Sequence, residues 1–420
     1  MSIDLIKRNS ESIVIETLSD TPVTVIQGAR QVGKSTLATI VANNIVSKSV
    51  TFDSDATLAA AQENGLEFVE QFPEGTLIID EIQKCPELLS AVKLSVDKDR
   101  RPGRFLITGS ANLLNIRGSN ESLAGRAETI VLEPFSVGEV NGIKEDFVSL
   151  LMCKDFQSKL NKTKPCTRAD YVRLIESGGY PDAQGRRGRR RYAFFKNYLT
   201  RVLDHDASEL SGLAHVDRMQ TIFTLLAGTP SQIYINANVS RAVKIPESSM
   251  NGYIRLLEDL SLIHVLPAWG KNYSKRAIGR PKVVLSDTGL VCSMNGVSDG
   301  FLANIENGNE LGPLIEAFVI NEIAKQQTWS GIGFDMYHYR DKDGKEVDLV
   351  IELSSGEVIA IEIKAASSFS RKDFSGMKAL RDMLGNRFHC GVLLYTGTEV
   401  HPFGDRLYCA PVSSIWQFSS

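Results

Sequence analysis

The sequence predicts an α/β protein of several domains: a parallel sheet with a phosphate-binding loop, then helices followed by a strand pair, then a second α/β domain. Three observations support this. A glycine-rich loop joins an apolar run to a helical stretch near the N-terminus, helical patterns dominate the middle, and the last third returns to apolar strands. With 420 residues, the chain has room for about two to four domains.

The composition is that of a soluble globular protein, with 43% hydrophobic and 23% charged residues and a net charge of −3. This near-neutral balance does not favour nucleic-acid binding as a property of the whole chain, so any such binding must be local. The six cysteines form no C-x-x-C pair, which argues against a disulfide framework or a zinc site. Because no apolar run is long enough to span a membrane and the N-terminus lacks signal-peptide order, we expect a cytoplasmic protein without a membrane partner.

Residues 28–36 read GARQVGKST and fit the phosphate-loop pattern G-x-x-x-x-G-K-[ST]. Glycines let the backbone N–H groups approach phosphate oxygens, Lys34 reaches the β- and γ-phosphates, and the Ser35 hydroxyl can bind Mg²⁺. A glycine turn without function is the alternative, but an apolar strand before the motif and a helix after it provide the required context. The predicted ATP contacts are Gly28, Ala29, Arg30, Gln31, Val32, Gly33, Lys34, Ser35 and Thr36.

A second motif, LIIDEIQK, places Asp80 and Glu81 at the end of an apolar strand. In enzymes with a phosphate loop, the first acid holds Mg²⁺ together with the loop hydroxyl, and an adjacent glutamate can polarise the attacking water. We therefore expect Asp80 with Ser35 at the metal and Glu81 in catalysis. An acid pair that only stabilises a helix N-terminus is the alternative.

The next predicted strand, FLITGSANLL, ends in the polar residues Thr108, Ser110 and Asn112. We expect this strand to lie between the two motif strands and to offer a side chain that senses the γ-phosphate. A fifth strand, within ETIVLEPFSVGEV, closes the core, which we assign to residues 1–140. The ligand-binding ends of all these strands would meet at one edge of a parallel sheet.

The set GARQVGKST, LIIDEIQK, FLITGSANLL, SLAGRAE and LEPFSVGE resembles a large prokaryotic family of AAA+ ATPases with a C-terminal domain of uncharacterised function. The resemblance implies ATP and Mg²⁺ as cofactors and Asn112 or Ser110 as the sensor. It also implies Arg126, or Arg117, as an arginine finger; a surface salt bridge is the alternative for Arg126. A finger acting in trans would make the protein a homo-oligomer.

Residues 141–213 are predicted to form a helical connector or lid. The stretch ESGGYPDAQG is similar to a GG-[FY]-P signature at this point of the same family. The run from Arg186 to Arg191 packs five arginines into six positions, either as a solvated helix start or as a contact for phosphate backbones.

Residues 214–290 show three helical patterns and then two alternating runs, the order of a winged helix-turn-helix. In a DNA-binding protein, the exposed face of the third helix, with Ser248, Ser249, Asn251 and Arg255, would enter the major groove. The predicted hairpin connection is basic, which favours DNA over a protein partner, although winged helices serve both. Its basic residues are Lys271, Lys275, Arg276, Arg280 and Lys282.

Residues 298–420 return to α/β patterns, and here Asp348 is followed by Glu362 and Lys364 on neighbouring apolar strands. This D…E-x-K pattern, with Glu316 on the preceding helix, resembles the restriction-endonuclease-like fold. The resemblance implies that Asp348, Glu362 and the Ile363 carbonyl bind Mg²⁺ and that Lys364 orients or deprotonates water. Active DNA cleavage, a non-cleaving binding domain and a simple ion pair all remain open alternatives.

Overall fold

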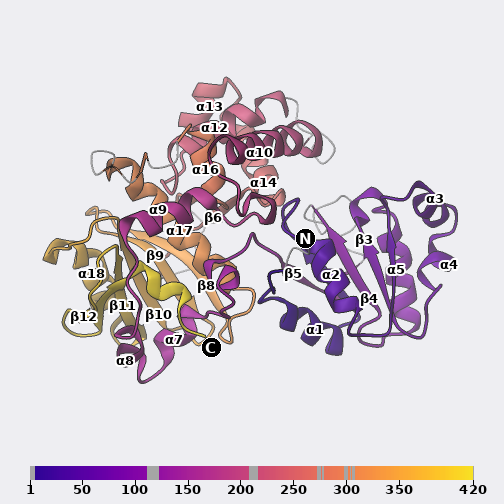
Figure 1. Ribbon diagram of the computed structural model, residues 1–420, viewed down its shortest axis with the longest axis horizontal. Coiled ribbons are helices and arrows are strands. Elements are labelled where there is room, and N and C mark those ends of the chain that lie inside the picture. The colour runs from indigo at the N-terminus through magenta and orange to yellow at the C-terminus, as the bar shows by residue number, and fades with distance from the viewer. Residues whose placement is uncertain are drawn as a thin grey trace. The chain divides into compact units, whose positions relative to one another are not determined.

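The computed structural model describes residues 5–110, 123–207, 216–271, 276, 279–297, 301–302, 304 and 308–419. The chain divides into two compact units (Figure 1). Unit 1 comprises Met1–Pro134, Asp206–Gly212 and Asp259–Ser261, and unit 2 comprises Phe135–His205, Leu213–Glu258 and Leu262–Ser420. Within the described ranges, no helix combines the length and the apolar character that crossing a membrane requires.

Unit 1 is built on a parallel sheet of five strands in the order β2-β3-β4-β1-β5. Its strands are β1 (Val23–Gln27), β2 (Ser47–Thr51), β3 (Thr76–Asp80), β4 (Phe105–Gly109) and β5 (Ala127–Val131). Its helices are α1 (Glu11–Asp20), α2 (Lys34–Ala42), α3 (Asp55–Glu63), α4 (Gly65–Val69), α5 (Leu88–Lys98) and the short 3₁₀ turn η1 (Ile82–Lys84). The expectation that the strand before Ser110 lies between the two motif strands is confirmed, because β4 pairs with both β1 and β3.

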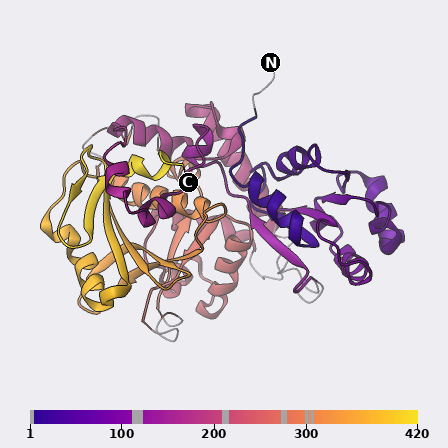
Figure 2. The same cartoon turned by 90° about the horizontal axis from the view of Figure 1, so that it is seen from below.

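Helices cover both faces of this sheet, so its central strands β1 and β4 are buried along their whole length. The buried stripe of α5, with Leu88, Val92 and Val96, packs on the face that carries Val25 and Ile79. Helices α1 and α2 lie across the sheet from α5 (Figure 1, Figure 2). Because the strands are parallel, their carboxyl ends all lie at one edge of the sheet, which carries the phosphate loop after β1 and the acids at the end of β3.

Unit 2 begins with helices that the sequence assigned to a connector. They are α6 (Val137–Val140), α7 (Phe147–Met152), α8 (Phe156–Leu160), α9 (Arg168–Ser177), η3 (Pro181–Ala183) and α10 (Gly188–Arg201), followed by the π-helical turn η4 (Val202–Asp206). The backbone N–H of Phe147 donates to the side chain of Gln326 at 2.7 Å, and the Trp329 indole donates to the carbonyl of Glu145 at 2.7 Å. These residues therefore belong to the same compact body as the C-terminal sheet and do not form a separate connector.

Three helices and a hairpin follow, in the order expected for a winged helix-turn-helix. The helices are α12 (Met219–Gly228), α13 (Asn236–Val243) and α14 (Met250–Asp259), and the hairpin strands are β6 (Ile263–Leu266) and β7 (Lys282–Leu285). The short 3₁₀ turns η5 (Val216–Arg218) and η6 (Glu247–Ser249) precede α12 and α14, and helix α16 (Thr288–Met294) follows the hairpin. Strands β6 and β7 are antiparallel. Helix α14 buries Met250, Tyr253 and Leu257, and it exposes Asn251 and Arg255, as the 3.6-residue period predicts.

The C-terminal part of unit 2 is a mixed six-stranded sheet in the order β12-β13-β11-β10-β9-β8. Its elements are α17 (Gly308–Gln326), β8 (Phe334–Arg340), β9 (Glu346–Leu353), β10 (Val358–Lys364), η8 (Arg371–Phe374), α18 (Ser375–Leu384), η9 (Gly385–Arg387), β11 (Phe388–Tyr395), β12 (His401–Pro402), β13 (Leu407–Pro411) and η10 (Val412–Trp416). Antiparallel pairing of Ile361 with Leu349 places Asp348 beside Glu362 at the adjoining position of these two strands.

Candidate functional site

The loop between β1 and α2 has a backbone suited to binding phosphate. A Cβ atom on Gly28 would lie 2.1 Å from the carbonyl oxygen of Leu132, so only glycine fits there. Gln31 and Gly33 have φ values of 62° and 99°, which turn successive N–H groups into one concavity. Helix α2 starts at Lys34, so its positive end faces the same loop.

Lys34 is buried and lies folded over this loop. Its Nζ donates to the carbonyl oxygens of Gly28 at 3.0 Å and Ala29 at 2.8 Å. Val32 is fully buried, so only its backbone can take part in binding, whereas Thr36 is exposed at the start of α2. The loop thus provides one buried cation and a ring of backbone donors, a combination that favours an anionic ligand.

Ser35, Asp80 and Thr108 meet at the ends of α2, β3 and β4. The Ser35 hydroxyl donates to Asp80 Oδ1 at 2.9 Å, and the buried Thr108 hydroxyl donates to the same oxygen. A hydroxyl and a carboxylate side by side are the donors that Mg²⁺ takes from phosphate-loop proteins, so Ser35 and Asp80 fit this ion.

Glu81 follows Asp80 in a left-handed conformation, with φ 61° and ψ 42°. Its N–H donates to the Thr108 hydroxyl at 3.3 Å, and its Oε2 accepts a hydrogen bond from the Gln83 amide. Gln83 in turn accepts from the N–H of Ser110 at 3.4 Å. A non-glycine residue held in this conformation is a form of strain typical of functional sites. The end of β4 therefore contacts Glu81 through both Thr108 and Gln83.

Two residues of this region, Arg8 and Thr108, make contacts that the sequence does not reveal. Arg8 is buried, and it donates to the carbonyl of Val32 at 2.9 Å and to the carbonyl of Glu133 at 2.6 Å, which ties the loop to the chain after β5. No sequence motif marks Arg8. Thr108 was noted only as one of three polar strand-end residues, yet it contacts both acids of the second motif.

The predicted sensor and finger have different outcomes. Asn112 and Arg117 lie outside the described residues, so the sensor assignment stays a prediction. Arg126 precedes β5 and donates to Asp97 Oδ1 at 2.6 Å, and the Arg126 hydrogen bond lowers the pKa of Asp97. Since Ala127 pairs with Val23 at the start of β1, Arg126 lies at the sheet edge opposite the phosphate loop. It does not serve the nucleotide of its own chain, and a role in trans stays a prediction.

In unit 2, the structure brings together the predicted acids Glu316, Asp348 and Glu362. The Ile363 N–H donates to Asp348 Oδ2 at 2.9 Å, and Lys364 pairs with Glu362 at 2.8 Å. The unexpected member is Lys282 of β7, whose buried Nζ lies 2.8 Å from Glu316, 3.3 Å from Glu346 and 3.7 Å from Asp348. From the sequence, Lys282 is one of the basic residues predicted to contact DNA, because nothing local links β7 to this cluster.

Burial and charge shift the titration of this cluster. Burial raises the pKa of Glu316 to about 7 and that of Glu362 to about 8, and the charge of Asp348 adds to both shifts. Burial likewise raises the pKa of Asp348. For Lys282, burial alone would lower the pKa, but the neighbouring Glu316 and Asp348 carboxylates raise it, so the ammonium form persists.

The expectation of Mg²⁺ bound by Asp348 and Glu362 does not fit this arrangement. The ammonium group of Lys282 occupies the space between the carboxylates of Glu316 and Asp348. Within the described ranges, no three acidic, histidine or cysteine side chains are arranged to hold a metal ion. Lys282 and Lys364 offset part of the negative charge of the cluster from inside.

The predicted basic connection between β6 and β7 is also largely internal. Arg276 pairs with Glu352 at 2.7 Å and lies over the Trp269 and Tyr337 rings at 5.5 and 5.0 Å. Lys282 is buried, and Lys275 lies outside the described residues. Only Lys271 and Arg280 among the described members are exposed, so the expectation of a basic wing is wrong for Arg276 and Lys282.

The arginine run at the start of α10 divides into two groups. Arg186 lies over the Phe194 ring at 4.9 Å and accepts, through its carbonyl, a hydrogen bond from Arg191. Arg187, Arg189 and Arg190 are exposed and make no ion pair with any residue that the structure describes. We call Arg187, Arg189 and Arg190 the α10 arginine surface. It is an exposed positive patch that remains available for the predicted contact with DNA.

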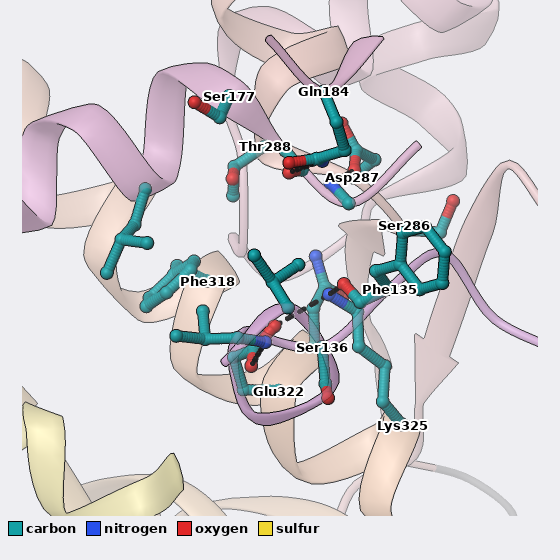
Figure 3. Close-up of a pocket in the computed structure, with 16 residues that line it drawn as sticks. Phe135, Ser136, Ser177, Gln184, Ser286, Asp287, Thr288, Phe318, Glu322 and Lys325 are labelled. Carbon is teal, nitrogen blue, oxygen red and sulfur yellow. Dashed lines mark hydrogen bonds and ion pairs between the residues drawn. The ribbon is translucent and has the colours of Figure 1, made fainter. Parts of the chain in front are cut away.

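A cavity of about 220 Å³ in unit 2 lies between α6, α9, α16 and α17 (Figure 3). Its charged groups Asp287, Glu322 and Lys325 all make hydrogen bonds within the protein. Asp287 accepts from the N–H of Gly179 at 2.6 Å, and Glu322 accepts from Lys325 at 2.6 Å. A Cβ atom on Gly178 would lie 2.2 Å from Asp287 Oδ1. The GGYP stretch thus has a packing role, because Gly178 leaves space for the Asp287 carboxylate and the N–H of Gly179 binds it.

Comparison with known protein families gives one match of known class. Residues 20–141 match the AAA domain, whereas residues 168–300 and 311–415 match domains of unknown function, DUF8612 and DUF4143. Uncharacterized proteins Rv2008c of Mycobacterium tuberculosis and Mb2031c of Mycobacterium bovis are each 27% identical over 412 residues, covering 97% of this chain and 84% of theirs.

Similar solved structures include the Walker-type ATPase PABY2304 of Pyrococcus abyssi, with a TM-score of 0.40 and 16% identity over 70% of this chain and 97% of that one. AMPPCP-bound DnaA from Aquifex aeolicus gives a TM-score of 0.27 and 13% identity over 61% of this chain and 90% of that one. Scores this low carry no argument about function. The family match and the parallel sheet with its phosphate loop together identify residues 20–141 as an AAA-type ATPase domain.

Proposed function

We propose that this chain is an ATP-driven switch: unit 1 binds and hydrolyses ATP, and unit 2 binds DNA without cutting it. The convergence of Lys34, Ser35, Asp80 and Glu81 at one sheet edge is the observation that carries the ATPase proposal. Lys34 would leave the loop carbonyls for the β- and γ-phosphates, and backbone N–H groups of residues 29–33 would cradle them.

Glu81 is the proposed general base. Its carboxylate follows β3 directly and would accept the proton of the water that attacks the γ-phosphorus. Ser35 and Asp80 would hold Mg²⁺, which neutralises phosphate charge when bound. Thr108 and Gln83 keep the Asp80 and Glu81 carboxylates in place through hydrogen bonds.

Measurement of ATP binding and turnover in the purified chain tests this proposal. Lys34→Ala removes the one buried cation of the loop, so ATP affinity should fall by about 10- to 100-fold. ATP turnover in Lys34→Ala equal to that of the unaltered chain would contradict the ATPase proposal.

The DNA-binding proposal rests on two exposed surfaces of unit 2. The three helices and the hairpin have the order of a winged helix-turn-helix, and α14 exposes Asn251 and Arg255 after the exposed Ser248. The α10 arginine surface adds three positive charges at a helix N-terminus, where cations are unfavourable unless an anion is near. The α10 arginine surface is suited to contact the phosphate backbone of DNA, and the exposed face of α14 is suited to contact base edges.

Titration of a labelled duplex at several salt concentrations, with and without a non-hydrolysable ATP analogue, tests this part. Arg189→Glu with Arg190→Glu should flatten the slope of log affinity against log salt by about two. Arg371→Glu with Lys372→Glu is the matched control, because both residues are exposed and the charge change is the same. Absence of binding at low salt in both nucleotide states would move unit 2 to the protein-interaction class.

Mg²⁺-dependent DNA cleavage by Asp348, Glu362 and Lys364 is the second candidate, and it rests on the D…E-x-K resemblance alone. The position of Lys282 between the carboxylates favours the non-cleaving alternative. Plasmid nicking in Mg²⁺ that disappears in Lys364→Ala would establish cleavage, and intact plasmid at high protein concentration would support binding without cleavage.

A further inference from the structure

The cluster of Glu316, Glu346 and Asp348 in unit 2 surrounds the ammonium group of Lys282, which comes from a different structural element. Glu346 and Asp348 lie two residues apart on β9, and therefore on one face of that strand, while Glu316 comes from α17. Lys282 of β7 enters from the hairpin, with only 3% of its side chain exposed. One ammonium group thus joins three elements of the fold through three carboxylates.

This arrangement resembles a cation site in which the cation is part of the chain. Carboxylates from two elements surround one position, as they do around hard divalent ions. The Nζ–oxygen distances of 2.8, 3.3 and 3.7 Å are ordinary for an ion pair with lysine. They are longer than the roughly 2.0–2.6 Å that Mg²⁺ and Ca²⁺ require, so these acids do not have metal-binding spacing while Lys282 lies among them.

The position of the hairpin is fixed by contacts besides Lys282. The N–H of Trp269 donates to the carbonyl of His338 at 2.6 Å, and His338 Nε2 lies 2.9 Å from the carbonyl of Arg280. Arg276 binds Glu352 on β9. Because these contacts hold the segment just before Lys282 against the sheet, the fold itself brings the lysine side chain to the cluster.

We propose that Lys282 is a built-in counter-ion that excludes divalent metal from the Glu316, Glu346 and Asp348 cluster, and that its removal creates a divalent-cation site there. The acids number four when Glu362 is included, against two lysines, so the ionised cluster keeps a net charge of −2. Replacing Lys282 by methionine keeps the length of the side chain and removes its charge, which leaves the carboxylates to a metal. The inference is independent of ATP and of DNA.

Lys364 is the matched control. It also pairs with an acid of the cluster, Glu362 at 2.8 Å, but 34% of its side chain is exposed and it lies 3.9 Å from Asp373. Lys364→Met therefore removes one lysine charge and leaves Lys282 in place. It is expected to bind no additional metal.

The test counts Mn²⁺ bound to the nucleotide-free chain from the spectroscopic signal of free Mn²⁺. The Lys282→Met chain should bind one more Mn²⁺ than the unaltered chain, at least about tenfold more tightly than any competing site, and Asp348→Asn in that background should remove it. Mn²⁺ should also raise the melting temperature of Lys282→Met and leave that of Lys364→Met unchanged.

Two results would overturn the proposal. One is Mn²⁺ binding by the unaltered chain that Asp348→Asn abolishes, because the lysine would then not exclude metal; this comparison holds even if Lys282→Met does not fold. The other is a folded Lys282→Met chain, shown by circular dichroism, that binds no more Mn²⁺ than the unaltered chain.

Discussion

At Gly28, a single added carbon atom would disturb the conformation of the phosphate-binding loop. A Cβ atom there would meet the carbonyl oxygen of Leu132 at 2.1 Å, whereas one on Gly33 would meet nothing within 4 Å. Gly28→Ala should therefore displace the loop, cost about 1–3 kcal/mol of unfolding free energy and weaken ATP binding. Gly33→Ala, which carries only the strain of its φ of 99°, should cost less. Chemical denaturation and ATP titration compare the two, and equal losses would contradict this account of the loop.

Glu145 makes the stability of unit 2 depend on pH. A Cβ atom on Gly138 would lie 1.9 Å from its carboxylate, so glycine admits the buried side chain. Burial raises the pKa of Glu145 from 4.5 to about 8, and the charges of Glu322 and Glu139 add to the shift. The folded chain thus keeps a proton that the unfolded chain releases. The stability from this group is complete below pH 4.5 and is lost as the pH rises to about 8.

Glu145→Gln is the corresponding test, because glutamine cannot titrate. The unfolding free energy, measured in urea from pH 5 to pH 8, should fall less steeply with pH in this variant. The difference in slope should correspond to about one proton fewer released on unfolding. Slopes that are identical in the two chains would contradict the assigned shift.

At the scale of elements, the hairpin of β6 and β7 is a docked element whose basic residues serve the fold. Arg276 joins it to β9 through Glu352 and also donates to the carbonyl of Gly270 at 2.7 Å. Arg276→Ala should lower the unfolding free energy by about 1–3 kcal/mol and leave the salt dependence of DNA binding unchanged. The exposed Arg280→Ala is the control and should not alter stability. A flatter slope of log DNA affinity against log salt concentration in Arg276→Ala would contradict this account and support a contact between Arg276 and the DNA backbone.

Most elements could be predicted from local patterns. The apolar runs before Gly28 and Asp80 predict β1 and β3, and the three helical patterns within residues 214–290 correspond to α12, α13 and α14. The pattern around Asp348 and Glu362 correctly predicts their juxtaposition, because two residues on paired strands share a face.

The remainder depends on contacts between residues far apart in the chain. Lys282 and Arg276 form one basic run with Arg280 in sequence, yet the first two bind acids beyond residue 315, which no local period reveals. Arg8 is likewise defined by its contact with Val32 and Glu133. Sequence patterns identify a basic residue, but only the fold determines whether it pairs with an acid inside the molecule or stays exposed to solvent.

At the scale of the whole molecule, Arg126 raises the question of assembly. Its pairing with Asp97 at the edge opposite the phosphate loop rules out action on the nucleotide of its own chain. If it acts in trans, Arg126→Ala should reduce ATP turnover by up to about 10³- to 10⁵-fold with little change in ATP affinity. Turnover per chain should then rise with protein concentration. A rate that is independent of concentration would argue against a finger in trans.

The most direct test of the central claim, that unit 1 hydrolyses ATP with Glu81 as the base, is single-turnover hydrolysis by Glu81→Gln. Glutamine preserves the size of the side chain and its hydrogen bond with Gln83 but cannot accept the proton. The account predicts ATP affinity close to that of the unaltered chain and hydrolysis slowed by about 10²- to 10⁴-fold. Hydrolysis at the unaltered rate, in a variant that binds ATP normally, would contradict it.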